Sequence, residues 1–431
     1  MHNAQRAANR PVLQHCVPHL LRNGAWCIAF AFAGACGRAN IDSIDAGSPR
    51  TGDATVGVDA PVEDGRASTD AAFRSDGNTS GHVDPQEAGV DRAADAGAEG
   101  GVEPPSCSPG GAGRSDCGAS HESCCASLPV PGGTFFRTYD PVDASSGQVQ
   151  LAPDGGPGGE ADPAQVSSFR LDKYLVTVGR FREFVQAWNG GAGWLPAGGS
   201  GRHTHLNGGL GLVDVSAEAG TRYEAGWVAE DDGNVAPTDA NLECDPANSA
   251  TWTPAIGSQE GLPINCVNWY EAYAFCIWDG GFLPSEAEWI YAAAGGAEQR
   301  QYPWGSAAPG TANQYAIYDC YYRGAGPPYC TSVVNIAPVG AAALGVGLWG
   351  QLDLTGDEWE WNLDGHSGYA TPCSDCALLG NFSSRAVHGG DFGRDLIRPS
   401  IRGMASSTLR NNSYGIRCAR AWLPAPGGGS P

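Results

Sequence analysis

The sequence predicts a mixed domain of short helices and strands, joined by long loops and stapled by disulfides. Two stretches near the middle of the chain carry helix-capping patterns, at Asn268 and at Ser285. The segment 168–174 alternates apolar and polar residues, as a half-buried strand does. The 431 residues include 63 Gly, 30 Pro and 15 Cys, which favours one loop-rich, disulfide-stapled domain over several regular ones.

The predicted globular domain, residues 127–423, opens over 130–135 with a turn followed by a short strand. A second strand follows at 168–174, and Thr177 then caps a helix. The apolar residues of that helix fall on one face: Val178, Phe181, Phe184, Val185 and Trp188. The Gly-rich region 189–262 is predicted to be either a long ordered loop or partly mobile, with three residues available to pack it: Trp194, Trp227 and Trp252.

Two further helices are predicted between 262 and 289. Asn268 is a good N-cap, and Glu271 lies three residues on, where its carboxylate can reach back to the cap amide. Ser285 and Glu288 repeat this capping box. The first of these helices is predicted to end at two glycines, which enter the left-handed cap without a Cβ penalty: Gly280 and Gly281.

The segment 37–105 carries much of the formal charge of −22. It holds 14 Asp and Glu against 5 Arg, a net of −9, and its only aromatic residue is Phe73. So little apolar area cannot offset the entropy of ordering, and we expect a disordered, self-repelling tether. Nucleic acid is excluded as an expected partner, because phosphate contacts need clustered Lys and Arg.

Residues 1–36 resemble an export signal, with a basic flank and a short apolar run over 25–33. The run is far shorter than the ~20 residues of a membrane-spanning helix. It ends in Ala33-Gly34-Ala35-Cys36, which resembles a bacterial lipobox although Ala33 stands where Leu is usual. We expect either a lipid-anchored Cys36, the only membrane contact, or cleavage without lipid. Either outcome implies export, and the lipid anchor would place the protein in the bacterial cell envelope or periplasm, or at the outer-membrane surface.

Cysteine usage is typical of an oxidising compartment. After the three Cys of the N-terminal 36 residues, twelve remain and can form six disulfides. Cys373 and Cys376 have the spacing of a redox motif, but they follow a strand-like segment, so we expect a structural clip. Four cysteines lie in a Cys-rich neck over 106–126, where zinc thiolates are the alternative to disulfides: Cys107, Cys117, Cys124 and Cys125.

The chain also resembles the formylglycine-generating-enzyme family, or sulfatase-modifying factors. The longest similar block is LPINCVNWYEAYAFCIWDGGFLPSEAEW at 262–289. Shorter blocks follow in the family's order: YPWG at 302–305, GQLDLTGDEWEW at 350–361, HGGDF at 388–392 and GIRCA at 415–419. The resemblance implies an α+β formylglycine-generating-enzyme fold, related to C-type-lectin-like domains, with little regular secondary structure. The 13 Trp of this chain suit the Trp-rich core of that fold.

The resemblance implies a disulfide between Cys276 and Cys418, because the family pairs these two positions. Such a bond closes a long loop and is worth about 4–5 kcal/mol in the chain-entropy description. Proximity in the sequence alone predicts three more pairs: Cys244–Cys266, Cys320–Cys330 and Cys373–Cys376.

Active members of the family oxidise a cysteine of a sulfatase peptide to an aldehyde. They hold copper(I) with two cysteines, separated by four residues, in the segment after the Gly-Gly pair, since soft thiolates select this ion. Here Arg394 and Pro399 occupy those positions, so we expect no copper. The segment instead carries charged residues, which form either surface salt bridges or a site for an anionic ligand: Arg394, Asp395, Arg398 and Arg402.

Two other metal sites are candidates. His203 and His205 are the only close pair among nine His, and alternation would place both on one face of a strand. No third ligand follows at useful spacing, so hydrogen-bonded surface histidines are the alternative to an iron site. The resemblance implies structural calcium held by oxygen ligands, unless these residues only cap a turn: Asn313, Asp357 and Glu360.

We therefore expect an exported, monomeric domain of the formylglycine-generating type that lacks the copper-binding pair and acts as a surface binding module. Its candidate surface is the segment 394–402 with the Trp-rich loops, which suit a peptide or a carbohydrate. The alternatives are an active oxidoreductase, of the Cys-to-formylglycine type or with another metal centre, and a structural envelope protein. A Gly/Pro tail follows at 424–431.

Overall fold

The computed structural model describes residues 103–422, except for 109, 141–161, 218–219, 246–248, 328–329 and 331. The predicted export signal with Cys36, almost all of the acidic tether and the Gly/Pro tail lie outside the described residues. The described residues belong to one compact unit. Within them, the helices are all too short or too polar to cross a bilayer.

The helices begin where the sequence predicts. Helix α1 spans Val178–Trp188, α3 spans Trp269–Trp278 and α4 spans Glu286–Ala293. The predicted caps are confirmed, because the N-cap side chains of all three helices accept a backbone N–H and both capping boxes close. Helix α3 ends as Gly280 enters the left-handed region at φ 79°. Helix α2 is one turn, Asp239–Leu242, and five 3₁₀ helices are η1 Asn189–Gly191, η2 Asn207–Gly209, η3 Ala229–Asn234, η4 Gly296–Glu298 and η5 Val333–Asn335.

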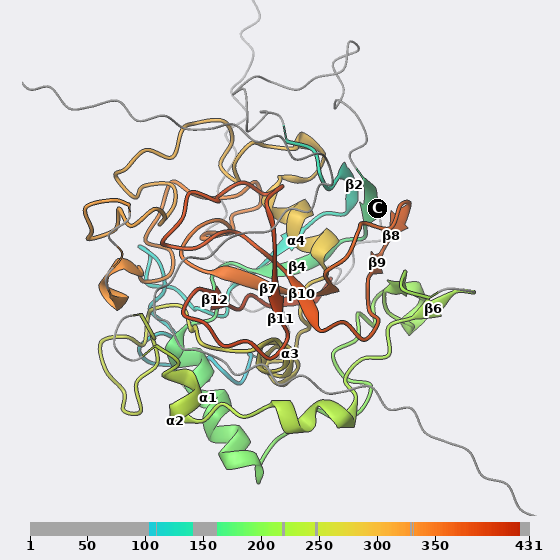
Figure 1. Ribbon diagram of the computed structural model, residues 1–431, viewed down its shortest axis with the longest axis horizontal. Helices are drawn as coiled ribbons and strands as arrows, with labels where there is room; N and C mark the ends of the chain where they lie inside the picture. The colour runs from blue at the N-terminus through green and yellow to red at the C-terminus, as the bar shows by residue number, and fades with distance from the viewer. Residues whose placement is uncertain are drawn as a thin grey trace, which may run out of the picture. The chain divides into compact units, whose positions relative to one another are not determined.

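The main sheet has the strand order β11-β10-β7-β12 and lies between α3 and α4 in Figure 1. Its strands are β7 Trp359–Gly365, β10 Ser384–His388, β11 Arg402–Ser406 and β12 Tyr414–Gly415. Every residue of β7 is buried, as expected for a strand with helices packed against it. The sheet is mixed, since β12 runs parallel to β7 and β10 runs antiparallel to both of its neighbours.

Three smaller sheets complete the fold. The sheet β1-β4-β13 joins Ser127–Val130, Phe169–Asp172 and Ala419–Ala421. The sheet β2-β3-β8 joins Gly133–Phe136, Pro163–Val166 and Cys373–Ser374. The sheet β6-β5-β9 joins Arg222–Tyr223, Val213–Asp214 and Cys376–Ala377.

The turn and the short strand predicted over 130–135 are confirmed, and the strand is β2, Gly133–Phe136. Strand β1 ends at Val130 and β2 starts at Gly133 in a different sheet. The turn needs glycine at Gly132, since a Cβ there would lie 2.5 Å from the carbonyl oxygen of Val166. The predicted strand over 168–174 is confirmed as β4, which is shorter than expected at Phe169–Asp172.

Tryptophan side chains fill the core, as the composition suggests. Trp227, Trp289 and Trp361 are among the largest fully buried side chains. Trp227 and Trp252 anchor the long 189–262 region to the cluster around α1 and α3, which confirms the ordered-loop alternative for its described residues. Packing large apolar surface in this way stabilises a region that has little regular structure of its own.

All twelve cysteines after Cys36 form disulfides. The four predicted pairs are confirmed, including Cys276–Cys418, which joins α3 to the segment before β13. The zinc alternative for the neck is wrong, since its four cysteines pair with one another: Cys107–Cys125 and Cys117–Cys124.

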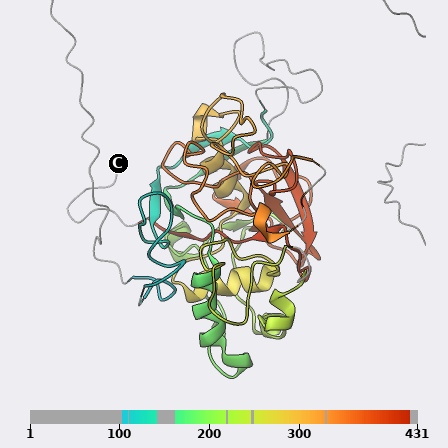
Figure 2. The same ribbon diagram turned by 90° about the vertical axis from the view of Figure 1, so that its left-hand side faces the viewer.

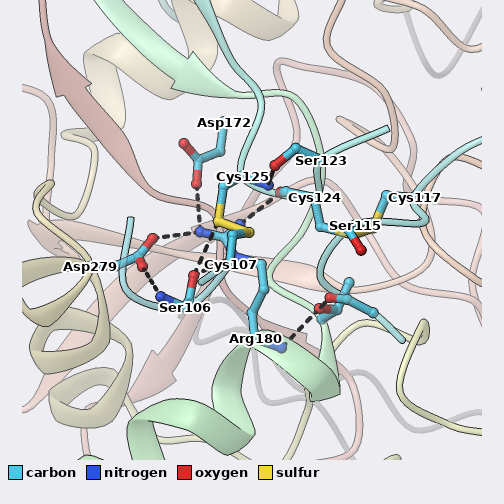
Figure 3. Close-up of a disulfide and its surroundings, with 12 residues drawn as sticks. Ser106, Cys107, Ser115, Cys117, Ser123, Cys124, Cys125, Asp172, Arg180 and Asp279 are labelled. Atoms are coloured by element: carbon cyan, nitrogen blue, oxygen red, sulfur yellow. Dashed lines mark hydrogen bonds and ion pairs between the residues drawn. A yellow bond between two sulfur atoms is a disulfide. The ribbon is translucent and has the colours of Figure 1, made fainter. Parts of the chain in front are cut away.

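The neck packs against the domain beside α1 and forms part of it (Figure 2). The guanidinium of Arg180 in α1 is fully buried at this contact (Figure 3). It donates to Ser106 Oγ at 3.0 Å and to the carbonyl oxygen of Cys124 at 3.1 Å. It also pairs with Asp172 at 3.1 Å and Asp279 at 2.6 Å, so one cation joins the neck, β4 and the end of α3.

Candidate functional site

The segment that follows β10 forms the candidate site. Gly389 and Gly390 leave the strand with φ of 103° and 75°, and a Cβ on Gly390 would lie 2.2 Å from the carbonyl oxygen of Leu396. This glycine-dependent turn buries Asp391, which is 4% exposed. Its carboxylate accepts the N–H of Gly393 at 2.9 Å and the indole N–H of Trp359 at 3.2 Å.

A polar pocket of about 540 Å³ lies beside Asp391. Segments far apart in the sequence contribute to its walls: the loop after α2, the loop closed by Cys320–Cys330, the segment after β10 and the turn before β12. The lining residues are mostly polar: Asp245, Ser249, Cys330, Asp391, Phe392, Gly393, Arg394, Asn412 and Ser413.

Two carboxyl groups and one guanidinium line the pocket. Burial raises the pKa of Asp391 above its ordinary value. Arg394 Nε lies 4.0 Å from Asp391 Oδ2, and the Arg394 side chain is 69% exposed. Elsewhere in the lining, Asn412 Nδ2 donates to Asp245 Oδ2 at 2.6 Å. The pocket therefore offers carboxylate acceptors next to a cation that solvent largely surrounds.

Asn265 joins the two segments of the lining that carry Ser249 and Asn412. Its Nδ2 donates to the carbonyl oxygens of Ser249 and Asn412, both at 2.9 Å, and to Glu358 Oε1 at 3.1 Å. Glu358 is fully buried, and burial and then the neighbouring Asp357 raise its pKa well above the ordinary value. Its other oxygen, Oε2, has no hydrogen-bond partner among the described residues, which fits a neutral carboxyl group at this position.

The residues at this site do not fit a copper(I) centre built from two thiolates. Arg394 and Pro399 stand at the two positions, and neither offers a sulfur ligand. Cys330 lines the same pocket, but its sulfur is bonded to Cys320. Among the described residues, one group of three could hold a metal by proximity, and it contains the bonded pair Cys117–Cys124 beside Asp116.

The structure separates the four predicted ligand-binding residues. Arg394 lines the pocket, while the exposed Asp395 does not. Arg398 pairs with Asp140 at 3.1 Å, and Arg402 holds Glu286 at 2.5 and 2.8 Å through two nitrogens. Arg398 and Arg402 therefore form salt bridges, as the first alternative expects. Arg394 lines the pocket and stays the candidate for contact with an anionic ligand.

Arg402 binds the carboxylate of Glu286, the first residue of α4, and this contact is structural. His388 stands where the family motif has arginine, and it contributes Nε2 at 2.7 Å from Glu286 Oε1. Arg402 is the cross-strand partner of His388 on β11 and adds a guanidinium at the same carboxylate. Burial alone would raise the pKa of Glu286, but His388 and then Arg402 lower it to about 2.

The placement predicted for the histidine pair is wrong. Neither residue lies on a strand, and His203 is fully buried rather than at the surface. The ring of His203 lies between Glu224, at 3.0 Å from Nδ1, and Glu288, at 3.1 Å from Nε2. Burial disfavours the charged ring, but the two carboxylates outweigh it and raise the pKa of His203 to about 10. Burial lowers the pKa of His205, which stacks on Phe282.

The three calcium candidates differ in how their oxygens are used. Glu360 binds Arg417 through both oxygens, at 2.9 to 3.1 Å, and also accepts the indole N–H of Trp289. Asp357 Oδ1 accepts the N–H of Ala337, while Asp357 Oδ2 and Asn313 Oδ1 have no partner among the described residues. Asp357 and Asn313 thus retain oxygen atoms that a hard cation could use, whereas the charge of Glu360 is already paired.

Cys373 and Cys376 form a buried clip between two sheets rather than a redox motif at a helix. Cys373 lies on β8 and Cys376 on β9, and both are 3% exposed. Asp375, between them, accepts hydrogen bonds from the N–H and the hydroxyl of Ser167 at 2.6 and 2.7 Å. The expected structural clip is confirmed.

Sequence reasoning missed most of the pocket. Asp391 appears only as the last polar residue of the HGGDF block, and the segments that carry Asp245 and Asn412 contain no motif. One signal was available, because an acidic residue replaces the family's small serine directly after the Gly-Gly pair. Sequence reasoning singled out Cys330 only as a disulfide partner, and it did not single out Asp245, Ser249, Asp391, Asn412 and Ser413.

The fold and the site together define a class of protein: an α+β, disulfide-stapled domain with a polar pocket at the end of β10. Residues 115–422 match the family described as Sulfatase-modifying factor enzyme 1-like domain. The chain belongs to this family.

The chain is similar in sequence to three relatives whose descriptions name an activity or its absence. The chain is 26% identical over 312 residues to hercynine oxygenase of Mycolicibacterium smegmatis, covering 68% of this chain and 60% of that protein. It is 26% identical over 322 residues to the formylglycine-generating enzyme of Bos taurus, covering 70% and 76%. It is 28% identical over 250 residues to inactive C-alpha-formylglycine-generating enzyme 2 of Mus musculus, covering 55% and 68%.

Proposed function

We propose that this domain is a ligand-binding module that uses the pocket beside Asp391 and does not carry out copper-dependent cysteine oxidation. The observation that carries the proposal is the composition of the pocket. Where two thiolates would hold copper, the chain has Arg394 and Pro399, and the pocket walls are carboxyl, amide and hydroxyl groups.

A peptide or a carbohydrate is the ligand class that these groups favour. The carboxylates of Asp245 and Asp391 accept from hydroxyl or amide donors, and the hydroxyls of Ser249 and Ser413 can donate or accept. Arg394 adds a donor for a carboxylate or a carbonyl. The family includes a protein described as inactive, so a member without the oxidase reaction has a precedent.

The second candidate is an oxidoreductase that works through different residues. It is favoured by the relatives described as a formylglycine-generating enzyme and as hercynine oxygenase. Such an enzyme would need a centre other than the missing cysteine pair. The buried clip at Cys373 and Cys376 and the carboxylate-bound His203 offer little access to a substrate.

Mass spectrometry on a sulfatase-type Cys-x-Pro-x-Arg peptide separates the two functions. The oxidatively folded chain is incubated with the peptide, copper, oxygen and a thiol reductant, beside an active family enzyme. We expect no loss of the cysteine thiol and no aldehyde product. Conversion of the peptide would refute the binding-module proposal and establish catalysis without the usual pair.

The binding arm uses pocket variants. A panel of short peptides and oligosaccharides is screened by thermal shift, and hits are titrated by calorimetry. Asp245→Asn is expected to weaken a hit about tenfold, the loss of one charge-assisted hydrogen bond. Asp395→Asn is the matched control, because Asp395 is exposed next to Arg394 but does not line the pocket. Hits that respond equally to both changes would place the binding surface elsewhere.

Calcium binding and lipid anchoring also remain proposals. If Asp357 and Asn313 hold calcium, a chelator lowers the unfolding temperature of the purified protein, and added calcium restores it. If Cys36 is acylated, the cell-derived protein carries a lipid mass on a mature N-terminal Cys36. An unchanged unfolding temperature, or an unmodified N-terminus, would contradict the respective proposal.

A further inference from the structure

One of the six disulfides opens onto the pocket. Ten of the twelve paired cysteines are buried, while Cys244 and Cys330 are half-buried, and of the twelve only Cys330 lines the pocket. Its sulfur lies 3.7 Å from the carbonyl oxygen of Phe392 in the pocket wall. Its partner Cys320 is 3% exposed. A small molecule in the pocket therefore lies against Cys330, whose sulfur is next to the pocket wall, whereas Cys320 is buried.

We propose that Cys330 is a modification site, at which a small cationic thiol exchanges into the Cys320–Cys330 bond. The incoming thiolate attacks Cys330 Sγ and forms a new disulfide with it. The Cys320–Cys330 bond breaks, and Cys320 leaves as a thiolate that takes one proton from water. One disulfide replaces another, so the step needs no added oxidant or reductant.

The surroundings of Cys320 allow this bond to open while the domain stays folded. The Cys320 N–H donates to the carbonyl oxygen of Phe392 at 2.8 Å, and the Phe392 N–H donates to Asp357 at 3.0 Å. These backbone hydrogen bonds hold the pocket wall independently of the disulfide. The bond also closes a loop with a sequence separation of only 10, and short loops contribute least to stability in the chain-entropy description.

The charges in the pocket select the thiol. Asp245 and Asp391 contribute two carboxyl groups against the single guanidinium of Arg394, which is 69% exposed. This net negative charge attracts an ammonium group on the incoming thiol and repels a carboxylate. At separations of several ångströms in a partly hydrated site, one unit of net charge changes a rate by about tenfold.

The test compares three thiols on the oxidised full chain: cysteamine, 2-mercaptoethanol and 3-mercaptopropionate. Each is supplied at the same thiolate concentration, because the thiolate is the nucleophile. The reaction is quenched with acid, free thiols are alkylated and the peptides are mapped by mass spectrometry. We expect the adduct on Cys330 and the alkyl group on Cys320 before any other disulfide opens. Cysteamine should react about tenfold faster than 2-mercaptoethanol, which lacks its ammonium group, and about a hundredfold faster than 3-mercaptopropionate, from which it differs by two units of charge.

Two pocket variants test the charge argument without touching the disulfide. Asp245→Asn removes one carboxylate and should shrink the preference for cysteamine, while Arg394→Gln removes the cation and should enlarge it. Earlier reaction at Cys244, simultaneous opening of all six bonds, or a rate independent of thiol charge would each overturn the proposal.

This inference uses the pocket of the proposed function but does not depend on a reversible ligand. Its failure is therefore distinguishable from failure of the binding-module proposal. Selective exchange at Cys330 in a protein that converts the sulfatase peptide would support the inference and remove the proposed function. An inert Cys330 in a protein that binds a peptide or sugar in the same pocket would do the reverse.

Discussion

Replacing Arg180 with methionine removes the cation that joins the neck to the domain. In the folded protein its guanidinium is fully buried and pairs with Asp172 and Asp279, whose side chains are both 0% exposed. Methionine fills most of the volume but leaves two buried carboxylates with fewer partners. Arg420 still pairs with both, at 2.9 and 2.7 Å, so the network loses half of its positive charge and not all of it.

The expected cost follows from these contacts. Removing one partner of a buried ion pair costs about 3–5 kcal/mol, because the remaining charge is left uncompensated. The hydrogen bonds to Ser106 and Cys124 add about 1 kcal/mol each, and the retained Arg420 offsets part of the total. We therefore expect Arg180→Met to lower the free energy of unfolding by about 4 kcal/mol.

Urea unfolding followed by tryptophan fluorescence measures this change, with all six disulfides verified by intact mass. Arg222→Met is the matched control, since Arg222 pairs with Asp214 at 2.5 Å but is 57% exposed. A pair of that kind contributes about 1 kcal/mol or less. Hydrogen exchange over 106–126 gives a second readout, because the neck loses two anchors in the Arg180 variant only. A loss below about 1 kcal/mol, or one equal to the control, would refute the argument from buried charge.

Three further predictions concern pH and the disulfides. The pKa of His203 is raised to about 10 from 6.5, so its contribution to folding stability is complete below pH 6.5 and is lost as pH rises through 10. The urea midpoint of the wild type should therefore fall between these two pH values, and that of His203→Gln should change less. The pKa of Glu286 is lowered to about 2 from 4.5, so its contribution to folding stability is complete above pH 4.5 and is lost as pH falls through 2. Glu286→Gln should remove this acid-induced loss of stability. An unchanged dependence of stability on acid pH would contradict the assignment. Replacing Cys276 and Cys418 with serine should cost about 5 kcal/mol, from the sequence separation of 142, and a loss under about 2 kcal/mol would show that the unfolded chain retains structure here.

Features set by neighbouring residues could be predicted from the sequence. The boxes Asn268–Glu271 and Ser285–Glu288 close within one helical turn, so their geometry depends on the local backbone alone. The pairing of Cys276 with Cys418 spans most of the domain and could be predicted only through resemblance to a family. The turn before β2 could be predicted, but the reason that it requires glycine at Gly132 could not, because the Val166 carbonyl that forbids a side chain there comes from another strand.

The candidate site could be predicted only in part, because its partners converge from distant segments. His203 looked like a surface residue, since Glu224 and Glu288 lie 21 and 85 residues away and neither belongs to a shared motif. Arg402 was grouped with Arg394 by proximity in sequence. The register of β10 and β11 instead places it opposite His388, where it completes the ion pair with Glu286. Charge spacing along a chain does not reveal such cross-strand compensation.

Residues 414–421, near the end of the described domain, have a consequence for the order of assembly. Strand β12 pairs with β7, Arg417 neutralises Glu360 in the core, Cys418 bonds to α3, and β13 completes the sheet with β4. Within the domain these residues are synthesised after the segments that they contact, so these contacts form only once the rest of the domain has been made. Contacts between segments so far apart in the sequence form slowly, so we expect this segment to be among the last to pack during folding.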